Sequence, residues 1–348
     1  MLDQPNAKSL PVGFLDMSKA FDRMDKSKLI EKLAERGVNR KLVTIIHNFL
    51  SERTQQVKLG DHRSSTLTTK NGTPQGTLLG PLFWLLYIDS LCPSSSTAVK
   101  YADDLTLTPN SIANSKSDLQ NTIDEVTRWC DEHNMIANPK KSVIINLSNI
   151  HNRYVPPSEN FTMQGEQITT ETSAKFLGVT VDEHLTFKEH VDNIVKKVRK
   201  LIYTLLDLKR SGIPFYMLQT FYTACIRPTI LYASPAWFTL MTHTQRLRIE
   251  RLENLALKII RPDTADYADR VTSCNITPIL DLMNEQYKQY IDKIIQNDNH
   301  CLHKTVLKYK PAPPTRPTRQ VKNSSTKPST RRTKLRYKSP LIQCWVPE

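Results

Sequence analysis

Apolar residues recur along the first half of the chain at two spacings, and the spacing predicts which segments are strands and which are helices. Pro11–Asp16 is apolar up to its final acid, as expected of a buried strand that ends in a carboxylate. Helical spacing predicts helices over Lys26–Arg36 and Arg40–Ser51, with Gly37 as the C-cap of the first. The pattern also predicts a two-stranded hairpin, two further helices and a strand, at Thr54–Leu59 with Ser64–Thr69, Thr77–Leu91, Ser115–Asn134 and Ser142–Leu147. Because strands and helices mix without strict alternation, we expect an α+β fold, an antiparallel sheet with helices on one face.

The second half of the chain is predicted to be mainly helical. A turn-rich stretch at 148–159 leads to a short β segment near Lys175–Val181, and helical spacing then runs from His190 to Leu257. One apolar stripe is made by Val191, Ile194, Val195, Val198, Leu201, Ile202, Leu205 and Leu208. The opposite face is basic, with Lys196, Lys197, Arg199, Lys200, Lys209 and Arg210. That face either follows a phosphate backbone or is simply solvated, and the sequence favours neither.

The composition is that of an ordinary soluble globular protein, with 39% hydrophobic and 24% charged residues. No run approaches the roughly 18 apolar residues of a membrane span, and no secretory pattern opens the sequence, so we expect an intracellular protein without membrane contact. The six cysteines lack zinc-ligand spacing. Most of the net charge of +14 lies after residue 298, where 12 Lys and Arg accompany one acid. This proline-rich tail should not fold alone, and it is either a polyanion-binding arm or a solvated end.

Two adjacent carboxylates, Asp103 and Asp104, are the most informative chemical feature. They follow Tyr101 and Ala102 and lie between two β-rich apolar runs, which predicts a tight hairpin with two acids at its tip. Like charges so close repel each other, and they need either a cation or plain solvation. A hard divalent metal held by carboxylate oxygens is one interpretation, and a solvated turn is the other.

A second acid and a bent loop give this pair a context. Asp16 lies where the early strand ends, and it could face Asp103 if that strand pairs beside the hairpin. Two or three carboxylates can hold two Mg²⁺ ions about 3.5–4 Å apart, as phosphodiester synthesis requires. The segment 71–76 (NGTPQG) contains two glycines and a proline ahead of a helix, so its backbone can approach a nucleotide or template closely. Gln75 could hydrogen-bond a base or a sugar.

Six ordered segments together resemble the reverse transcriptases of non-LTR (LINE-type) retrotransposons, most closely the CR1/jockey-like branch. FLDMSKAFD (14–22) resembles the first catalytic motif, and NGTPQGTLLGPLFWLLYID (71–89) resembles the template-and-nucleotide loop with its helix. YADD (101–104) resembles the catalytic hairpin, and NPKKS (138–142) resembles the motif after the palm helix. FLGV (176–179) resembles the primer-grip hairpin, and the helical region with RPTILYASPAW (227–237) resembles the thumb.

The resemblance implies a polymerase site with assigned roles. Asp16 and Asp103 would bind two Mg²⁺ ions, for which Mn²⁺ could substitute, with Asp104 in support. Lys141 would be the general acid that protonates pyrophosphate, with Lys140 as the competing choice, and either could be only a surface lysine. The nucleotide pocket would contain Met17, Phe21, Gln75 and Gly76. Phe21 would act as the steric gate against a ribose 2′-hydroxyl, its alternative being a core aromatic. The primer grip would be Phe176, Leu177 and Gly178, unless these residues form an ordinary strand. Asp22 is expected to cap the helix that follows.

The same resemblance implies a right-hand polymerase fold and its partners. We expect a palm over residues 1–150, a linker with the primer-grip hairpin over 151–187, a helical thumb or connection over 188–300, and a disordered basic tail over 301–348. The fingers and an upstream endonuclease are expected to be missing, because Asp16 lies only 15 residues from Met1. Partners would be an RNA template, a DNA primer or target, and dNTPs, with access to the nucleus. The alternatives are a non-catalytic nucleic-acid-binding remnant and a structural fragment without a partner.

Overall fold

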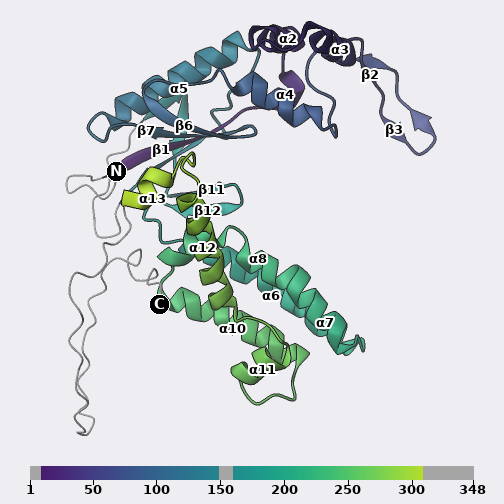
Figure 1. The fold of residues 1–348 in the computed structure, drawn as a ribbon, viewed down its shortest axis with the longest axis vertical. Coiled ribbons are helices and arrows are strands. Elements are labelled where there is room, and N and C mark those ends of the chain that lie inside the picture. Colours follow the sequence, from purple (N-terminus) through teal and green to yellow (C-terminus); the bar gives the residue numbers. More distant parts are fainter. Residues whose placement is uncertain (1–8, 149–159, 309–348) are drawn as a thin grey trace. The chain divides into compact units, whose positions relative to one another are not determined.

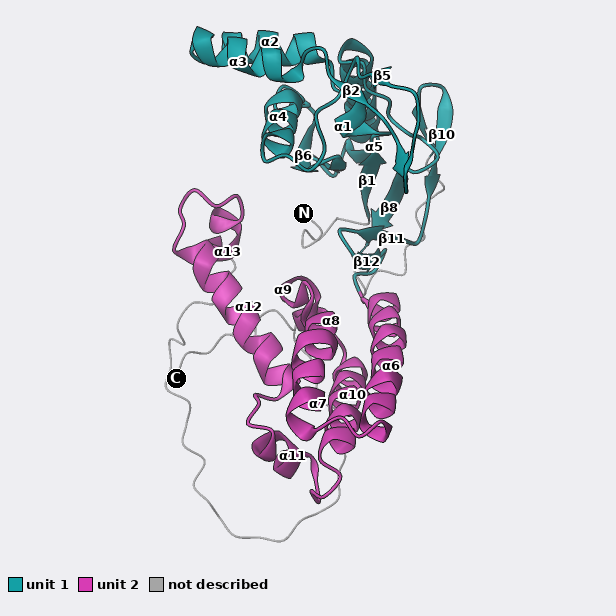
Figure 2. Ribbon diagram, turned by 90° about the vertical axis from the view of Figure 1, so that its right-hand side faces the viewer, with its two compact units in different colours: residues 1–185 teal, residues 186–348 magenta. Residues whose placement is uncertain are grey.

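The computed structural model describes residues 9–148 and 160–308 of the chain. They divide into two compact units, residues 1–185 and residues 186–348, which Figure 2 colours separately. The unit boundary lies two residues before the point at which the helical domain was expected to begin. The expected tail lies outside the described residues except for its first eight, and so do most of the turn-rich residues 148–159.

A six-stranded sheet forms the centre of the first unit. Its strands lie in the order β6 (Ser96–Tyr101), β7 (Asp104–Pro109), β1 (Leu10–Asp16), β8 (Val143–Leu147), β10 (Glu166–Thr170) and β9 (Phe161–Met163). All neighbouring pairs are antiparallel except β8 and β10, which are parallel. The α+β class and the strands expected around the acids are confirmed. β9 and β10 were not expected, and they lie in the stretch predicted as a linker.

The long helix α5 (Ser115–Glu132) covers one face of this sheet, as Figure 1 shows. Leu15 pairs in register with Leu105, and both side chains are buried on the helix side. Gly13 lies on the same face, where a Cβ atom would stand 3.5 Å from Leu119 of α5. Because side chains alternate along a strand, Phe14 and Asp16 point to the opposite face. The sheet thus separates an apolar core from the face that carries the acids.

Short helices and an arm surround the sheet in the first unit. They are α1 (Ala20–Arg23), α2 (Lys26–Glu35), α3 (Arg40–Leu50) and α4 (Leu79–Ile88), the arm strands β2 (Thr54–Gln55), β3 (Lys58–Leu59), β4 (His62–Arg63) and β5 (Leu67–Thr68), and the hairpin β11 (Ser173–Phe176) with β12 (Val179–Asp182). The expected helices and hairpins are present, although the arm pairs only as β2 with β5 and β3 with β4. Gly37 follows α2 with φ of 71°, as its predicted role as a C-cap requires.

The expectation that Asp22 caps a helix is wrong. Asp22 lies inside α1, and its carboxylate accepts a hydrogen bond from the Gln75 side chain instead. Asp25 is the cap of α2, because its carboxylate accepts from the amides of Ser27 and Lys28. The sequence contains an aspartate at both positions. The structure distinguishes them, because the first amides of α2, which lack partners within the helix, donate to Asp25.

Helix α4 is fixed to its neighbours by polar groups at its buried end. The Tyr87 hydroxyl donates to the His133 carbonyl at 2.6 Å and accepts from the Asp25 amide at 3.3 Å. The Lys100 ammonium of β6 donates to the carbonyls of Ile88 and Asp89. These carbonyls are at the C-terminal end of α4, where a cation also stabilises the helix dipole. Burial raises the pKa of Tyr87 to about 12.

The second unit is entirely helical within its described residues. Its elements are α6 (Lys188–Arg210), α7 (Phe215–Phe221), the π-helix η1 (Tyr222–Ile226), α8 (Arg227–Leu231), α9 (Ser234–Trp237), the 3-10 helix η2 (Phe238–Leu240), α10 (His243–Ile260), α11 (Tyr267–Ser273), α12 (Ile279–Ile295) and α13 (His303–Lys308). The predicted apolar stripe of α6 is buried, apart from Leu201 and Leu208, which are half-buried, and α6 packs against α10. On the basic face, Lys196, Lys197, Arg199 and Lys200 are exposed.

A buried carboxylate joins α10 to three other helices of this unit. Glu253 of α10 is fully buried and accepts hydrogen bonds from the hydroxyls of Tyr222 and Tyr267 and from the Ile279 amide. Burial and this carboxylate raise the pKa of both tyrosines, so the hydroxyls keep their protons. Each of the described helices is too short or too polar to cross a bilayer.

Candidate active site

The acids meet where β1 ends and β7 begins. The strand register pairs Asp16 directly with Asp104, whereas the expected partner of Asp16 was Asp103. Asp103 occupies the turn of the β6–β7 hairpin, immediately before the paired position. The strands therefore bring two carboxylates side by side on the open face of the sheet, with the third at the adjoining turn.

The electrostatics at this point favour a cation. Burial raises the pKa of the Asp104 carboxyl above its usual value, and the neighbouring carboxylates of Asp103 and Asp16 raise it further. In addition, the Oδ2 atom of Asp16 is buried and has no hydrogen-bond partner among the described residues. A buried acceptor without a donor is costly, and a metal ion would satisfy it while relieving the repulsion between the acids.

The donor set suits a hard cation such as Mg²⁺. Among residues 9–148 and 160–308, no three acidic, histidine or cysteine side chains converge into a complete ligand cluster. Mg²⁺ in nucleotide enzymes is commonly bound by one or two carboxylates and completes its shell with water and substrate phosphates. Asp16 and Asp104, with Asp103 beside them, therefore fit a cation that shares its coordination with a substrate.

A cavity of about 350 Å³ opens over the acid pair. Asp16 and Asp104 share its wall with Lys141, and the primer-grip candidates Phe176 and Leu177 form another side. The Phe176 ring packs against Phe14 of β1 with ring centroids 5.3 Å apart, which places the β11–β12 hairpin over the acid-bearing face. The third primer-grip candidate, Gly178, shares the turn of that hairpin with Leu177, and both have positive φ angles. The structure thus brings together candidates that are far apart in sequence.

The cavity also distinguishes among the lysines. Lys141 lines it, whereas its competitor Lys140 does not. Lys175 of β11 lines the same cavity and was missed, because nothing in the sequence separates it from other exposed lysines. Two lysines, Lys141 and Lys175, therefore line the cavity that contains the acid pair.

The loop at residues 71–76 is attached tightly to α1. The Gly72 amide donates to the Met24 carbonyl at 2.8 Å, and the Thr73 amide donates to the Phe21 carbonyl at 3.1 Å. Gly72 has φ of 84°, and a Cβ atom there would stand 2.8 Å from the Asp22 carbonyl oxygen. Only glycine fits such a close approach in this conformation. The Gln75 side chain completes the attachment by donating to Asp22 at 2.9 Å.

A second cavity, of about 720 Å³, lies between this loop, α1 and the base of the arm. Three basic residues line it, Lys19, Arg53 and Lys70, together with Gln75. All three are exposed, and the Asp22 carboxylate is the sole acid of the lining. These three residues were not predicted as site residues, because they come from separate segments of the chain.

Three nucleotide-pocket candidates differ in their exposure. Met17 is only 2% exposed, so its side chain belongs to the core and only its backbone can approach a ligand. Phe21 is half-buried and packs against Trp84 with ring centroids 5.3 Å apart. It therefore combines the core role and an accessible edge. Gly76 is exposed with φ of 76° and has open space where a Cβ atom would be.

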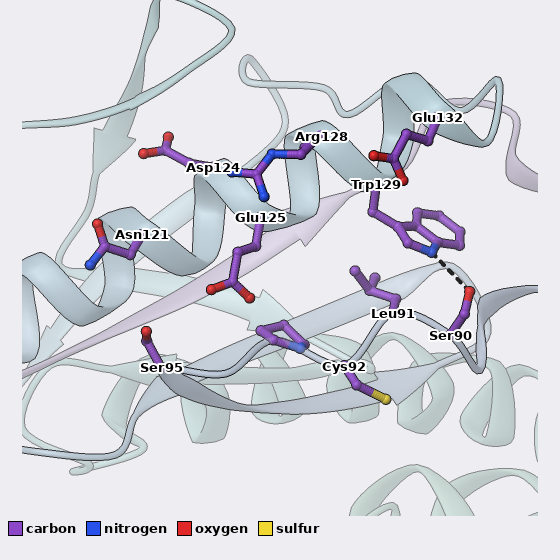
Figure 3. A pocket seen from close by; sticks show the side chains of 11 residues that line it. Ser90, Leu91, Cys92, Ser95, Asn121, Asp124, Glu125, Arg128, Trp129 and Glu132 are labelled. Atoms are coloured by element: carbon purple, nitrogen blue, oxygen red, sulfur yellow. Dashed lines mark hydrogen bonds between the residues drawn. The ribbon is translucent and has the colours of Figure 1, made fainter.

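A third cavity, drawn in Figure 3, lies on the other side of the sheet and contains none of the candidate residues. Two of its polar side chains, Glu125 and Trp129, already have hydrogen-bond partners. Glu125 accepts from the amide and hydroxyl of Ser94, and the Trp129 indole donates to the Ser90 hydroxyl. We therefore assign the chemistry to the face with the acids.

The chain is similar to known proteins over most of its length. Residues 2–181 match the family model described as reverse transcriptase (RNA-dependent DNA polymerase). The chain is 25% identical over 322 residues to a probable RNA-directed DNA polymerase from transposon BS of Drosophila melanogaster, covering 89% of this chain and 34% of that protein. It is 26% identical over 270 residues to the RNA-directed DNA polymerase from mobile element jockey of the same fly, covering 73% and 29%.

The chain spans about a third of the length of these curated relatives. Among solved structures, a telomerase from Candida tropicalis in complex with a telomeric RNA fragment covers 88% of this chain and 50% of its own, with 12% identity and a TM-score of 0.39. A likeness at that level carries no argument here, so the family rests on the sequence match.

Proposed function

Because the chain belongs to the reverse transcriptase (RNA-dependent DNA polymerase) family, we propose that it carries the catalytic centre of an RNA-directed DNA polymerase of a non-LTR retrotransposon. The observation that supports this most is the register of β1 and β7, which sets Asp16 beside Asp104 with Asp103 at the turn. The unpartnered Asp16 Oδ2 atom points to the same use.

The proposed reaction is nucleotidyl transfer. The primer 3′-hydroxyl gives its proton to solvent and its oxygen bonds to the α-phosphorus of a dNTP, the bond from that phosphorus to the β-phosphate breaks, and pyrophosphate leaves. Divalent cations at Asp16, Asp103 and Asp104 would lower the pKa of the attacking hydroxyl and neutralise charge on the leaving group. Lys141 lies in the same cavity and would supply the proton that pyrophosphate takes. Mg²⁺ is the expected cation, and Mn²⁺ would substitute for it.

The neighbouring residues would orient the substrates. Lys19, Arg53 and Lys70 present three positive charges beside Gln75, which suits the polyphosphate of a dNTP. Phe21 is fixed against Trp84 at the other side of α1 and would exclude a ribose 2′-hydroxyl. Phe176 and Leu177 would hold the primer end over the acids. We further propose that residues of the first unit act as the palm and the helices of the second as the thumb, with nuclear DNA as the target.

Primer extension tests this proposal. The full chain is incubated with an RNA template, a DNA primer, dNTPs and Mg²⁺, and compared with an Asp103→Ala/Asp104→Ala variant. Asp131→Ala/Glu132→Ala is the matched control, because it removes an adjacent, exposed acid pair at the end of α5. Incorporation should be lost in the first variant and kept in the second. Equal incorporation by the first variant and the wild type would refute the catalytic assignment.

A second function, nucleic-acid binding without catalysis, is supported by the exposed basic face of α6. Phosphate contacts of this kind weaken steeply as salt rises. The variant Lys196→Glu/Lys200→Glu should bind a primer–template duplex more weakly and with a shallower salt dependence. Lys288→Glu/Lys293→Glu on α12 makes the same charge change at exposed positions and should bind as the wild type does. Identical affinities for both variants would remove α6 from consideration, and deletion after Asn299 tests the tail in the same assay.

A further inference from the structure

A buried tryptophan that is not one of the acids contacts the β6–β7 turn, which carries Asp103. Trp84 lies on α4 and is 1% exposed. Its indole Nε1–H donates a hydrogen bond to the carbonyl oxygen of Ala102 at 2.6 Å. Ala102 is the residue immediately before Asp103. Helix α4 is thereby connected to the β6–β7 hairpin at its turn.

The conformation of Ala102 explains why such a connection is needed. Its φ angle is 53°, in the left-handed region that residues with a Cβ atom disfavour. A strained turn persists only where its surroundings hold it. The indole N–H satisfies the Ala102 carbonyl and is itself satisfied, so the bond stabilises the turn without leaving a buried donor unpaired. A relaxed turn would redirect the two aspartates that follow it.

Packing around helix α4 holds the Trp84 side chain in place for this contact. The Trp84 ring packs against the rings of Phe21 and Tyr87, at centroid distances of 5.3 Å and 6.3 Å. At the end of the same helix, Lys100 of β6 donates to the carbonyls of Ile88 and Asp89. The hairpin is thus joined to α4 at its turn through Trp84 and along its first strand through Lys100.

We propose that Trp84 is a positioning residue of this polymerase site, which holds the Ala102 turn so that Asp103 and Asp104 lie beside Asp16. It acts through the turn and does not itself touch a substrate. The role in catalysis rests on the proposed function, whereas the hold on the turn does not. The two parts can therefore be tested separately.

The test compares Trp84→Phe with Trp129→Phe in the full chain. Each change keeps an aromatic ring in the same apolar core and removes one indole donor. Trp129 is 7% exposed, and its indole donates to the Ser90 hydroxyl at 3.0 Å (Figure 3) and not to the Ala102 carbonyl. Hydrogen exchange of the peptide over residues 98–107 is measured for each variant. Peptides from α5 serve as the reference for overall folding.

We expect Trp84→Phe to raise exchange at residues 101–105 about five-fold, the size of one lost neutral hydrogen bond. Trp129→Phe should leave these residues at the wild-type rate. Adding Ala102→Gly to Trp84→Phe should restore much of the protection, because glycine adopts a positive φ without strain. Equal exchange at the turn in both tryptophan variants would overturn the proposal, and so would a failure of Ala102→Gly to reduce the effect.

Primer extension then separates the positioning role from the proposed chemistry. Trp84→Phe should lower kcat while the KM for dNTP stays within about two-fold, because the misplaced groups are the acids. Faster exchange at the turn without incorporation by the wild-type chain would count against the proposed function alone. An unchanged turn in an active enzyme would count against Trp84 alone.

Discussion

Replacing Gly72 by alanine tests whether the loop at residues 71–76 depends on its close approach to α1. A Cβ atom at Gly72 would stand 2.8 Å from the Asp22 carbonyl oxygen and 2.9 Å from both the Asp22 Cα and the Phe21 carbonyl oxygen. All three are backbone atoms, so no flexible side chain can move aside. The loop must therefore separate from α1, and its two backbone hydrogen bonds to Met24 and Phe21 must lengthen.

The magnitude follows from two separable costs. Alanine at a φ of 84° costs about 1 kcal/mol because of its left-handed conformation. Relieving the backbone overlap adds about 1–3 kcal/mol, as for other overpacked sites. Gly76→Ala is the matched control, because Gly76 lies in the same loop with φ of 76° and nothing within 4 Å of its added Cβ. The control should therefore cost only about 1 kcal/mol.

Urea unfolding followed by hydrogen exchange measures both variants. Peptides of β1 and α4 report the first unit, which must be followed by itself because the chain has two compact units. Gly72→Ala should lower the free energy of unfolding of this unit by about 2–4 kcal/mol, clearly more than Gly76→Ala. Equal losses in the two variants would refute the reasoning, because they would mean that the loop does not need its contact with α1.

Three further changes test the electrostatics and the cores. Asp104 has a raised pKa, so the folded state disfavours its charge, and stability is lost as pH rises from its usual pKa of 3.8 through the raised value. Asp104→Asn should therefore have a higher urea midpoint than the wild type at pH 7 in EDTA, with the difference shrinking towards pH 3.5; a midpoint below wild type at pH 7 would contradict this. Tyr87→Phe leaves the His133 carbonyl and the Asp25 amide unpaired and should lower the free energy of unfolding of the first unit by about 1–3 kcal/mol. Hydrogen exchange of α4 measures this loss, and an unchanged value would count against the hydroxyl contacts. Glu253→Gln replaces one acceptor oxygen by a donor, although three donors converge on this side chain. It should destabilise the second unit by about 2 kcal/mol or more while hydrogen exchange of α4 stays at the wild-type rate. A wild-type Tm for the second unit would show that the Glu253 hydrogen bonds are dispensable.

The elements around the acids could be predicted from sequence because their signals are local. A buried run ending in Asp16 and a hairpin tipped by two acids are visible in the spacing alone. The register is different, because a shift of one residue decides whether Asp16 faces Asp103 or Asp104. Only the paired backbone fixes that choice.

The features that the sequence did not reveal depend on distant segments or short elements. β9 and β10 have three and five residues, which is too few for a clear alternation of apolar and polar positions. β10 also pairs with β8 in parallel, so no tight turn in the sequence marks that pairing. Lys19, Arg53 and Lys70 meet in one cavity from separate parts of the chain. In the sequence, Trp84 does not differ from other apolar residues of a buried helix. Only the structure shows that the Ala102 carbonyl lies beside its indole.

Manganese titration followed by electron paramagnetic resonance tests most directly whether Asp16, Asp103 and Asp104 hold divalent cations. The full chain is compared with Asp16→Asn and with Asp22→Asn, an identical change six residues further on, where the carboxylate is bound by Gln75. Asp16→Asn should weaken Mn²⁺ binding about ten-fold or more, as expected for the loss of one charged ligand, while Asp22→Asn should titrate as the wild type does. Superimposable titrations of the wild type and Asp16→Asn would contradict the metal site.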